Sequence, residues 1–160
     1  MGLLGRLANR SRDVLFVPVL DRYWRRRLSG KVLCLLYHRV DEPANHPFMT
    51  QSGSPVIPPL ALERELRFLQ SQGAEFLTFA HLRAGQFPED DGFGVIVSFD
   101  DGFRDNYTQG LEVLETIGIK GVFFQSTALI DGPTLIWEHA LYWYGQHQRL
   151  RTAFADLTHA

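Results

Sequence analysis

Two adjacent carboxylates, Asp100 and Asp101, directly follow an apolar run at residues 94–99 that is typical of a buried strand. Proteins with parallel strands place their active sites at the carboxyl ends of those strands. Because like charges this close disfavour double ionisation, a cationic group is expected nearby to hold both groups as carboxylates, and a divalent metal would serve. Neighbouring residues leave an extended strand on opposite sides, so one carboxylate can bind the metal while the other faces its bound water. The competing interpretation is that Asp-Gly only makes a turn after the strand.

The segments that must position this pair alternate between short apolar runs and helical periodicity, the pattern of parallel strands joined by helices. Strands are predicted at residues 31–37, 75–77, 94–99 and 121–125, and helices at 59–72, 79–84, 105–117 and around 137–144. The fold class is therefore α/β, and four parallel strands can form an open sheet or half of a barrel. Pro, Ser, Gly and Asn dominate residues 43–59, which predicts a long loop at the carboxyl end of the first strand.

The same patterns predict the environment of several individual side chains. Cys34 lies inside an apolar run and is expected to be a buried small hydrophobe. One cysteine also excludes a disulfide framework and a cysteine-rich zinc site. Asp105 is expected to cap the helix that follows it, and Tyr107 is expected to face the core.

The composition indicates one globular domain. The chain has 160 residues, of which 45% are hydrophobic, and this is close to ordinary globular usage. Its 16 Lys and Arg against 18 Asp and Glu give a net charge of -2. That balance offers no global electrostatic reason to bind nucleic acid.

The charge is unevenly spread. Residues 1–28 carry seven arginines and two aspartates, a net charge of +5, while residues 29–160 carry a net charge of -7. We therefore divide the chain into a basic helical leader, 1–28, and a body, 29–160. The apolar stretch 14–20 is shorter than the roughly 20 residues that span a bilayer and lacks a secretory cleavage site, so a cytoplasmic location is expected. The leader is interpreted either as a helix over the domain with solvated arginines or as a peripheral contact to an anionic membrane surface.

Four segments in order resemble those of the polysaccharide deacetylases of carbohydrate esterase family 4. They are Leu-Leu-Tyr-His-Arg-Val (35–40), Phe-Leu-Thr-Phe (76–79), Val-Ser-Phe-Asp-Asp-Gly-Phe (97–103) and Gly-Ile-Lys-Gly-Val-Phe-Phe (118–124). The third resembles the family's first motif, usually Thr-Phe-Asp-Asp-Gly. The resemblance runs from about Val32 to Ile130 and implies part of a distorted (β/α) barrel with parallel strands and its site at the strand ends. Residues 146–160 supply no closing strand, so residues 29–160 are expected to form the N-terminal portion of the catalytic domain, incomplete at the C-terminus.

Carried over by position, the resemblance makes Asp100 the general base and Asp101 a metal ligand, with Zn²⁺ as the expected ion. An N-acetyl amide is a poor electrophile, so the metal would polarise its carbonyl and lower the pKa of bound water. Asp100 would accept the proton of that water. His38, at the end of the first strand, would contact the substrate or a metal ligand, unless it bonds only its own loop. Arg104 would reach the acidic pair.

The chain also departs from the family pattern. The family completes its metal site with two histidines three or four residues apart on a later strand, and no such pair follows Phe124. His139 and His147 are eight residues apart in a helical aromatic stretch. The Trp and Tyr residues of that stretch either stack on a sugar or pack among helices.

The function that these observations favour is a metal-dependent hydrolase that removes N-acetyl, or O-acetyl, groups from a polysaccharide or its precursor. Its partner would be an N-acetylated oligo- or polysaccharide. The alternative is a truncated, catalytically incompetent domain that keeps the sugar-binding groove. A third interpretation, an acidic magnesium pocket for phosphotransfer, needs a separate phosphoacceptor Asp and a Lys at a later strand end, and neither is evident.

Overall fold

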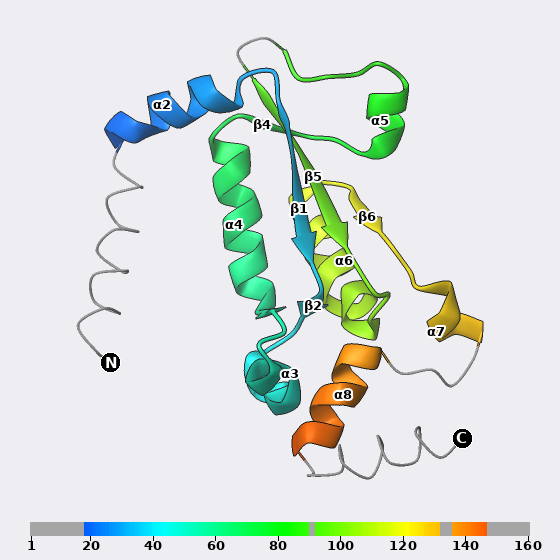
Figure 1. Ribbon diagram of the computed structural model, residues 1–160. Helices are drawn as coiled ribbons and strands as arrows, with labels where there is room; N and C mark the ends of the chain where they lie inside the picture. Colours follow the sequence, from blue (N-terminus) through cyan, green and yellow to red (C-terminus); the bar gives the residue numbers. More distant parts are fainter. Residues whose placement is uncertain (1–17, 90–91, 132–135, 147–160) are drawn as a thin grey trace.

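The computed structural model describes residues 18–89, 92–131 and 136–146 (Figure 1). The helices are α2 (Pro18–Leu28), α3 (Pro47–Ser52), α4 (Pro59–Ser71), α5 (Phe79–Arg83), α6 (Leu111–Ile117), α7 (Thr127–Asp131) and α8 (Trp137–Gln146). The strands are β1 (Val32–Tyr37), β2 (Arg39–Val40), β3 (Val56–Ile57), β4 (Ala74–Phe76), β5 (Phe93–Phe99) and β6 (Gly121–Phe123). A 3₁₀-helix, η1 (Pro43–Asn45), and a π-helix, η2 (Asn106–Gly110), complete the described elements. Parallel strands alternate with helices, so the predicted α/β class is confirmed.

β5 is the centre of a parallel four-stranded sheet. β1 pairs with it from Val32 opposite Gly94 to Tyr37 opposite Phe99. This pairing uses one edge of β5. The other edge of β5 is shared by two strands: β4 lies beside the beginning of β5 and β6 beside its end. A regular (β/α) barrel closes through eight strands in succession, whereas here β1 lies beside β5 and not beside β4. Within the described residues the sheet does not close, and the interpretation as part of a barrel stays a prediction.

One face of the sheet packs against α4 and α6 (Figure 1). Leu62 and Leu66 of α4 are fully buried, as the helical periodicity predicted. They belong to one core with Val95, Val97 and Phe99 of β5. Burying one such side chain stabilises the fold by about 1.5–3 kcal/mol. This layer therefore fixes β5 and, with it, the residues that follow the strand.

The opposite face of the sheet is less covered. Ser98 of β5 is fully buried there, and its hydroxyl donates a hydrogen bond to the Leu35 carbonyl oxygen at 3.0 Å. Cys34 is exposed, so the prediction that it is buried is wrong. β1 lies at the edge of the sheet, and side chains alternate between the two faces of a strand. Cys34 and Leu36 therefore point away from the helices and stay exposed in the described part of the chain.

The predicted loop after the first strand contains regular elements of its own. Pro47 begins α3, and Gly53 ends it in a left-handed conformation with φ 79°. β2 and β3 pair in parallel, with Arg39 opposite Val56. The predicted long loop therefore includes a short helix and a two-residue strand pair.

The expectation that Tyr107 faces the core is also wrong, because its side chain is 73% exposed. η2 is a π-helix, and its wider turn shifts the side-chain phase that a 3.6-residue period predicts. Asn106 and Gly110 take the buried positions instead. A Cβ on Gly110 would lie 3.3 Å from the Phe99 ring, so the small residue lets η2 approach β5 closely.

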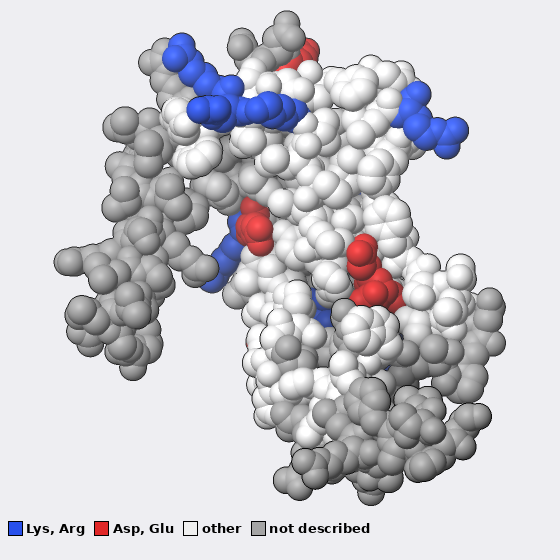
Figure 2. Space-filling view, in the orientation of Figure 1, with Lys and Arg blue, Asp and Glu red and all other residues white. Residues whose placement is uncertain are grey.

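α2 carries the basic end of the predicted leader. Arg25, Arg26 and Arg27 occupy its last turn and are exposed, and Figure 2 shows basic side chains along this helix at the upper left. Arg25 Nη2 donates to Gln72 Oε1 at 3.3 Å, which links α2 to the end of α4. Residues 1–17 lie outside the described residues, and the domain boundary after residue 28 stays a prediction. Among the helices described, none has the length and apolar character to span a bilayer.

Candidate functional site

The carboxyl ends of β1 and β5 lie side by side, and the candidate site is built from the residues that follow them. Tyr37 is opposite Phe99 in the ladder, and the Asp100 N–H donates to the Tyr37 carbonyl oxygen at 2.9 Å. His38 and Asp100 therefore leave the sheet at the same level. The register of the two strands thus brings His38, Asp100 and Asp101 to one end of the sheet.

Asp101 has a left-handed backbone with φ 70°, which no other described residue except glycine shares. Aspartate tolerates this region better than most residues, but it is still a strained conformation. Gly102 follows with φ 69°, and a Cβ there would lie 3.1 Å from the Gln125 side chain. Asp-Gly therefore does form a turn, and this turn brings Asp101 to the wall of a cavity. Strain of this kind clusters at functional sites.

Two buried atoms at this place, Asp100 Oδ1 and His38 Nδ1, have no hydrogen-bond partner. Leaving a buried polar atom unpaired costs about 1–3 kcal/mol, so such atoms in native proteins have a reason, for example an ion or a ligand. The Asp100 backbone is held on both sides, since Asn106 Nδ2 donates to the Asp100 carbonyl oxygen at 3.2 Å. The Asp100 backbone is thus fixed in position, while its buried Oδ1 has no hydrogen-bond partner.

A cavity of about 320 Å³ lies at this end of the sheet. It is lined by His38, Met49, Gly53, Ser54, Pro55, Asp101, Phe103, Ile136 and His139. The strand ends form its polar side, and α3 with the turn after it forms a wall. Carboxylate oxygen and imidazole nitrogen are ligand atoms that zinc takes in proteins. The lining therefore supplies ligand atoms of the kinds that zinc takes. Among the described residues, however, the group with three such atoms within 4.8 Å of one another is Asp41, His46 and Asp105.

His139 is the residue in this cavity that sequence reasoning set aside. Its spacing from His147 matches no metal motif, and His147 lies outside the described residues. The structure brings it in because α8 packs below the strand ends (Figure 1). The His139 and Phe103 rings stack with centroids 6.1 Å apart and planes at 26°. No local sequence signal marks this contact, because it depends on where α8 docks.

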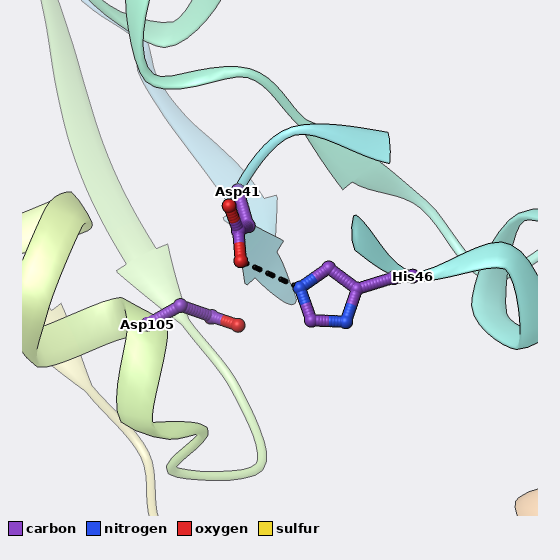
Figure 3. Close-up of side chains that lie close together, drawn as sticks. All are labelled: Asp41, His46 and Asp105. Atoms are coloured by element: carbon purple, nitrogen blue, oxygen red, sulfur yellow. Dashed lines mark hydrogen bonds and ion pairs between the residues drawn. The ribbon is translucent and has the colours of Figure 1, made fainter. Parts of the chain in front are cut away.

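A second cluster of possible metal ligands lies beside the cavity. Asp41, His46 and Asp105 each offer a ligand atom within 4.8 Å of the others, a spacing that fits a divalent ion (Figure 3). His46 Nε2 is 2.7 Å from Asp41 Oδ2. Hydrogen bonds hold the pKa of the Asp41 carboxyl well below its usual range; the bond from His46 has the largest effect and that from Gln109 the next largest. Sequence analysis gave none of these three residues a metal role.

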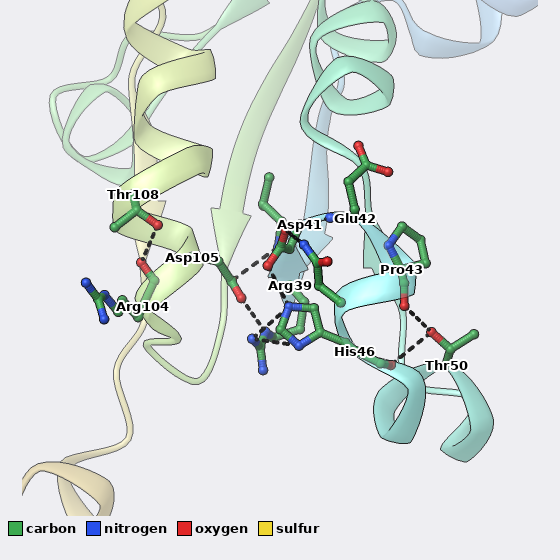
Figure 4. A network of polar contacts seen from close by, with 11 residues as sticks. Arg39, Asp41, Glu42, Pro43, His46, Thr50, Arg104, Asp105 and Thr108 are labelled. Carbon is green, nitrogen blue, oxygen red and sulfur yellow. Dashed lines mark hydrogen bonds and ion pairs between the residues drawn. The ribbon is translucent and has the colours of Figure 1, made fainter.

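Arg39 occupies the middle of this cluster (Figure 4). Its Nε donates to Asp105 Oδ2, and its Nη2 lies 3.4 Å from both ring nitrogens of His46. The Val40 N–H donates to the other oxygen of Asp105 at 3.2 Å. Asp105 therefore binds β2 and makes no side-chain cap, so the prediction that it caps the next helix is wrong. A cation here would compete with the Arg39 charge, which favours a structural role for the cluster.

Arg104 lies apart from both clusters. Its side chain is exposed, and its carbonyl oxygen accepts a hydrogen bond from the Thr108 hydroxyl at 3.3 Å. It lines a separate cavity of about 320 Å³ together with Tyr107 and Gln125. Figure 4 shows its side chain on the side of η2 that faces away from Asp105. Its contact with the substrate or the acidic pair stays a prediction.

Comparison with known proteins finds similarity among solved structures. No protein-family model and no curated protein matches the chain. IcaB from Ammonifex degensii is 27% identical with a TM-score of 0.48, over 61% of this chain and 38% of its own. The Streptococcus pyogenes deacetylase PplD in complex with acetate is 21% identical with a TM-score of 0.46, over 59% and 42%. A de-N-acetylase from Aggregatibacter actinomycetemcomitans is 24% identical with a TM-score of 0.49, over 66% and 42%. The chain thus spans about two fifths of the length of these solved chains, and polysaccharide deacetylases are among its structural neighbours.

Proposed function

We propose that residues 29–160 carry part of the catalytic domain of a metal-dependent polysaccharide deacetylase. The observation that carries the proposal is the carboxylate pair at the end of the central strand. Asp101 lines a cavity with two histidines, and Asp100 keeps a buried oxygen without a hydrogen-bond partner. A general base and a metal ligand on adjacent residues are what hydrolysis of an amide or ester by an activated water requires.

In this proposal Asp101 is one ligand of a divalent metal, and His38 and His139 line the same cavity. The metal, for which the proposal names Zn²⁺, would supply polarisation of the acetyl carbonyl and a lowered pKa of bound water. The left-handed turn at Asp101 orients the ligand residue. Phe103 and Met49 supply apolar surface beside the polar end, which suits the methyl group of an acetyl substituent.

Asp100 serves as the proton acceptor. Its backbone is fixed by the bonds to Tyr37 and Asn106, which hold the attachment point of the carboxylate at the end of β5. Asp100 Oδ1 is buried without a hydrogen-bond partner, so a donor at this atom would be stabilising. The substrate class is an N-acetylated, or O-acetylated, oligo- or polysaccharide, and His38 contacts either that substrate or a metal ligand.

The test compares three variants of the full-length protein by metal analysis and by acetate release from an N-acetylglucosamine tetramer. Asp101→Ala should lose both the metal and the activity. Asp100→Asn should keep the metal and lose on the order of 10² or more in turnover, as expected for a missing general base. Asp41→Asn is the matched control, because it changes a neighbouring carboxylate in the second cluster and should leave the metal content unchanged.

The opposite results would overturn the proposal. A metal retained by Asp101→Ala and lost from Asp41→Asn would place the ion in the Asp41–His46–Asp105 cluster. A metal-loaded protein that binds the tetramer without releasing acetate would instead favour the catalytically incompetent sugar-binding domain.

A further inference from the structure

A second hollow opens beside the candidate active site. Its volume is about 340 Å³, and it is lined by Phe48, His139, Ala140, Trp143 and Tyr144. Trp143 and Tyr144 are 41% and 40% exposed, so they are not packed away inside the helix layer. The sequence left open whether these aromatic residues pack or stack on a ligand, and their exposure around a hollow favours the ligand.

His139 separates this hollow from the cavity of Asp101, because it lines both. Its ring centroid lies 6.1 Å from that of Phe103, which lines the Asp101 cavity. On the other side it lies 6.0 Å from that of Phe48, which lines the aromatic hollow. The two cavities therefore share the His139 side chain as part of their lining.

The lining defines the chemistry of the occupant. Aromatic and apolar side chains form the hollow, and none of the described lining residues is Lys, Arg, Asp or Glu. The polar atoms of these side chains are the His139 ring nitrogens, the Trp143 indole N–H and the Tyr144 hydroxyl. A volume of this size is at the low end for small-molecule sites, which span about 300–1,000 Å³. An uncharged ring with apolar faces and a polar rim matches such a surface, since aromatic side chains offer flat faces at fixed angles. Trp143 and Tyr144 hold an edge-to-face arrangement at 82°, with ring centroids 5.3 Å apart, so these faces are pre-organised.

We propose that the aromatic hollow binds the sugar ring next to the one whose acetyl group lies at Asp101. The inference rests on the proposed deacetylase function and deepens it: the substrate is an oligosaccharide of at least two uncharged rings. His139 contacts both rings, and Trp143 supplies the stacking face for the second. A longer chain should therefore bind more tightly than a single sugar.

The experiment uses intrinsic fluorescence, because the chain has three tryptophans. In full-length protein, the substitutions Trp24→Phe and Trp137→Phe leave Trp143 as the only tryptophan of residues 1–160. Asp100→Asn slows turnover during the titration. Addition of the N-acetylglucosamine tetramer should shift the Trp143 emission, whereas the monosaccharide should shift it little. Calorimetry should then show about tenfold weaker tetramer binding in Trp143→Ala, which corresponds to about 1.4 kcal/mol.

Trp137→Ala is the matched control for calorimetry. Trp137 lies on the same helix and is 69% exposed, but it lines neither cavity. The Trp137→Ala variant should bind the tetramer with the same affinity as the unmodified protein. Trp143→Phe keeps an aromatic face and should restore most of the affinity, which separates lost stacking from lost folding.

Several results would overturn the inference. Equal tetramer affinity in Trp143→Ala and the unmodified protein would do so, and so would equal weakening by Trp137→Ala. A Trp143 emission that changes with protein concentration alone would show that a second copy of the protein occupies the hollow. The two proposals fail separately: acetate release without any Trp143 response refutes the sugar subsite, whereas a Trp143 response without acetate release refutes the deacetylase.

Discussion

Replacing Asp105 with alanine would remove the acceptor that holds β2 against the segment after Asp101. The Asp105 side chain is 6% exposed and that of Arg39 17%, so the substitution leaves a positive charge mostly out of water. The Val40 N–H loses its acceptor at the same time. Breaking a buried pair from one side costs about 3–5 kcal/mol. We expect the lower end, about 3 kcal/mol, because the Arg39 guanidinium keeps some water contact and lies 4.3 Å from the Phe103 ring centroid.

Urea unfolding of the full-length protein measures this loss. The matched control is Glu63→Ala, which also removes one negative charge but from a pair with Arg67 whose side chains are 28% and 50% exposed. The control should cost less than about 0.5 kcal/mol. At about 1 M salt, where the screening length is about 3 Å, the control effect should vanish and the Asp105 effect should persist. A loss in Asp105→Ala no larger than that of the control would refute the reasoning. A loss that disappears once a chelator has treated both proteins would show a metal in the cluster.

Three further predictions follow from single features of the fold. Gly121→Ala should destabilise by about 1–3 kcal/mol, the usual cost of overpacking, because the new Cβ would lie 2.6 Å from Leu114 Cδ1; an unchanged urea midpoint would contradict this. The lowered pKa of Asp41 means that its contribution to stability is present above the ordinary value of about 3.9 and is lost as the pH falls below it. The difference in unfolding free energy between the unmodified protein and Asp41→Asn should therefore shrink below pH ~4, and a difference that grows there would show the wrong sign. Changing the three exposed arginines at residues 25–27 to glutamine should weaken sedimentation with anionic vesicles by about 1 kcal/mol per charge at low salt, and unchanged sedimentation would leave the leader without a membrane role.

The position of Asp100 and Asp101 at the end of a buried strand could be predicted because one local pattern carried enough information. An apolar run as continuous as residues 94–99 is stable only when both faces of the strand are buried, and all seven residues of β5 are buried. Two charged groups directly after it cannot follow it into the core, so they mark the carboxyl end of a central strand. The positions of Asp100 and Asp101 follow from this without any knowledge of the other strands.

The walls of the site depend on information that no local pattern holds. Cys34 is exposed because β1 is an edge strand, and the order of strands cannot be predicted from the content of one strand. Tyr107 points outward because residues 106–110 adopt a π-helix in place of the expected α-helical turn. His139 reaches the cavity only through the docking of α8, and His46 meets Asp41 only through the fold of residues 41–46.

The central position of β5 also determines which parts of the molecule can unfold locally. Its backbone is hydrogen-bonded along both edges, with β1 on one side and β4 and β6 on the other. Amide protons in such a strand exchange with solvent only when most of the domain unfolds, whereas those of half-exposed surface helices exchange through local opening. The two carboxylates are attached to the end of this slowly exchanging strand, while α3 and α8 around them carry mostly exposed side chains. Insertions and substitutions in α3 and α8 can therefore alter which ligands enter the candidate site, while the strand that carries the two carboxylates stays intact.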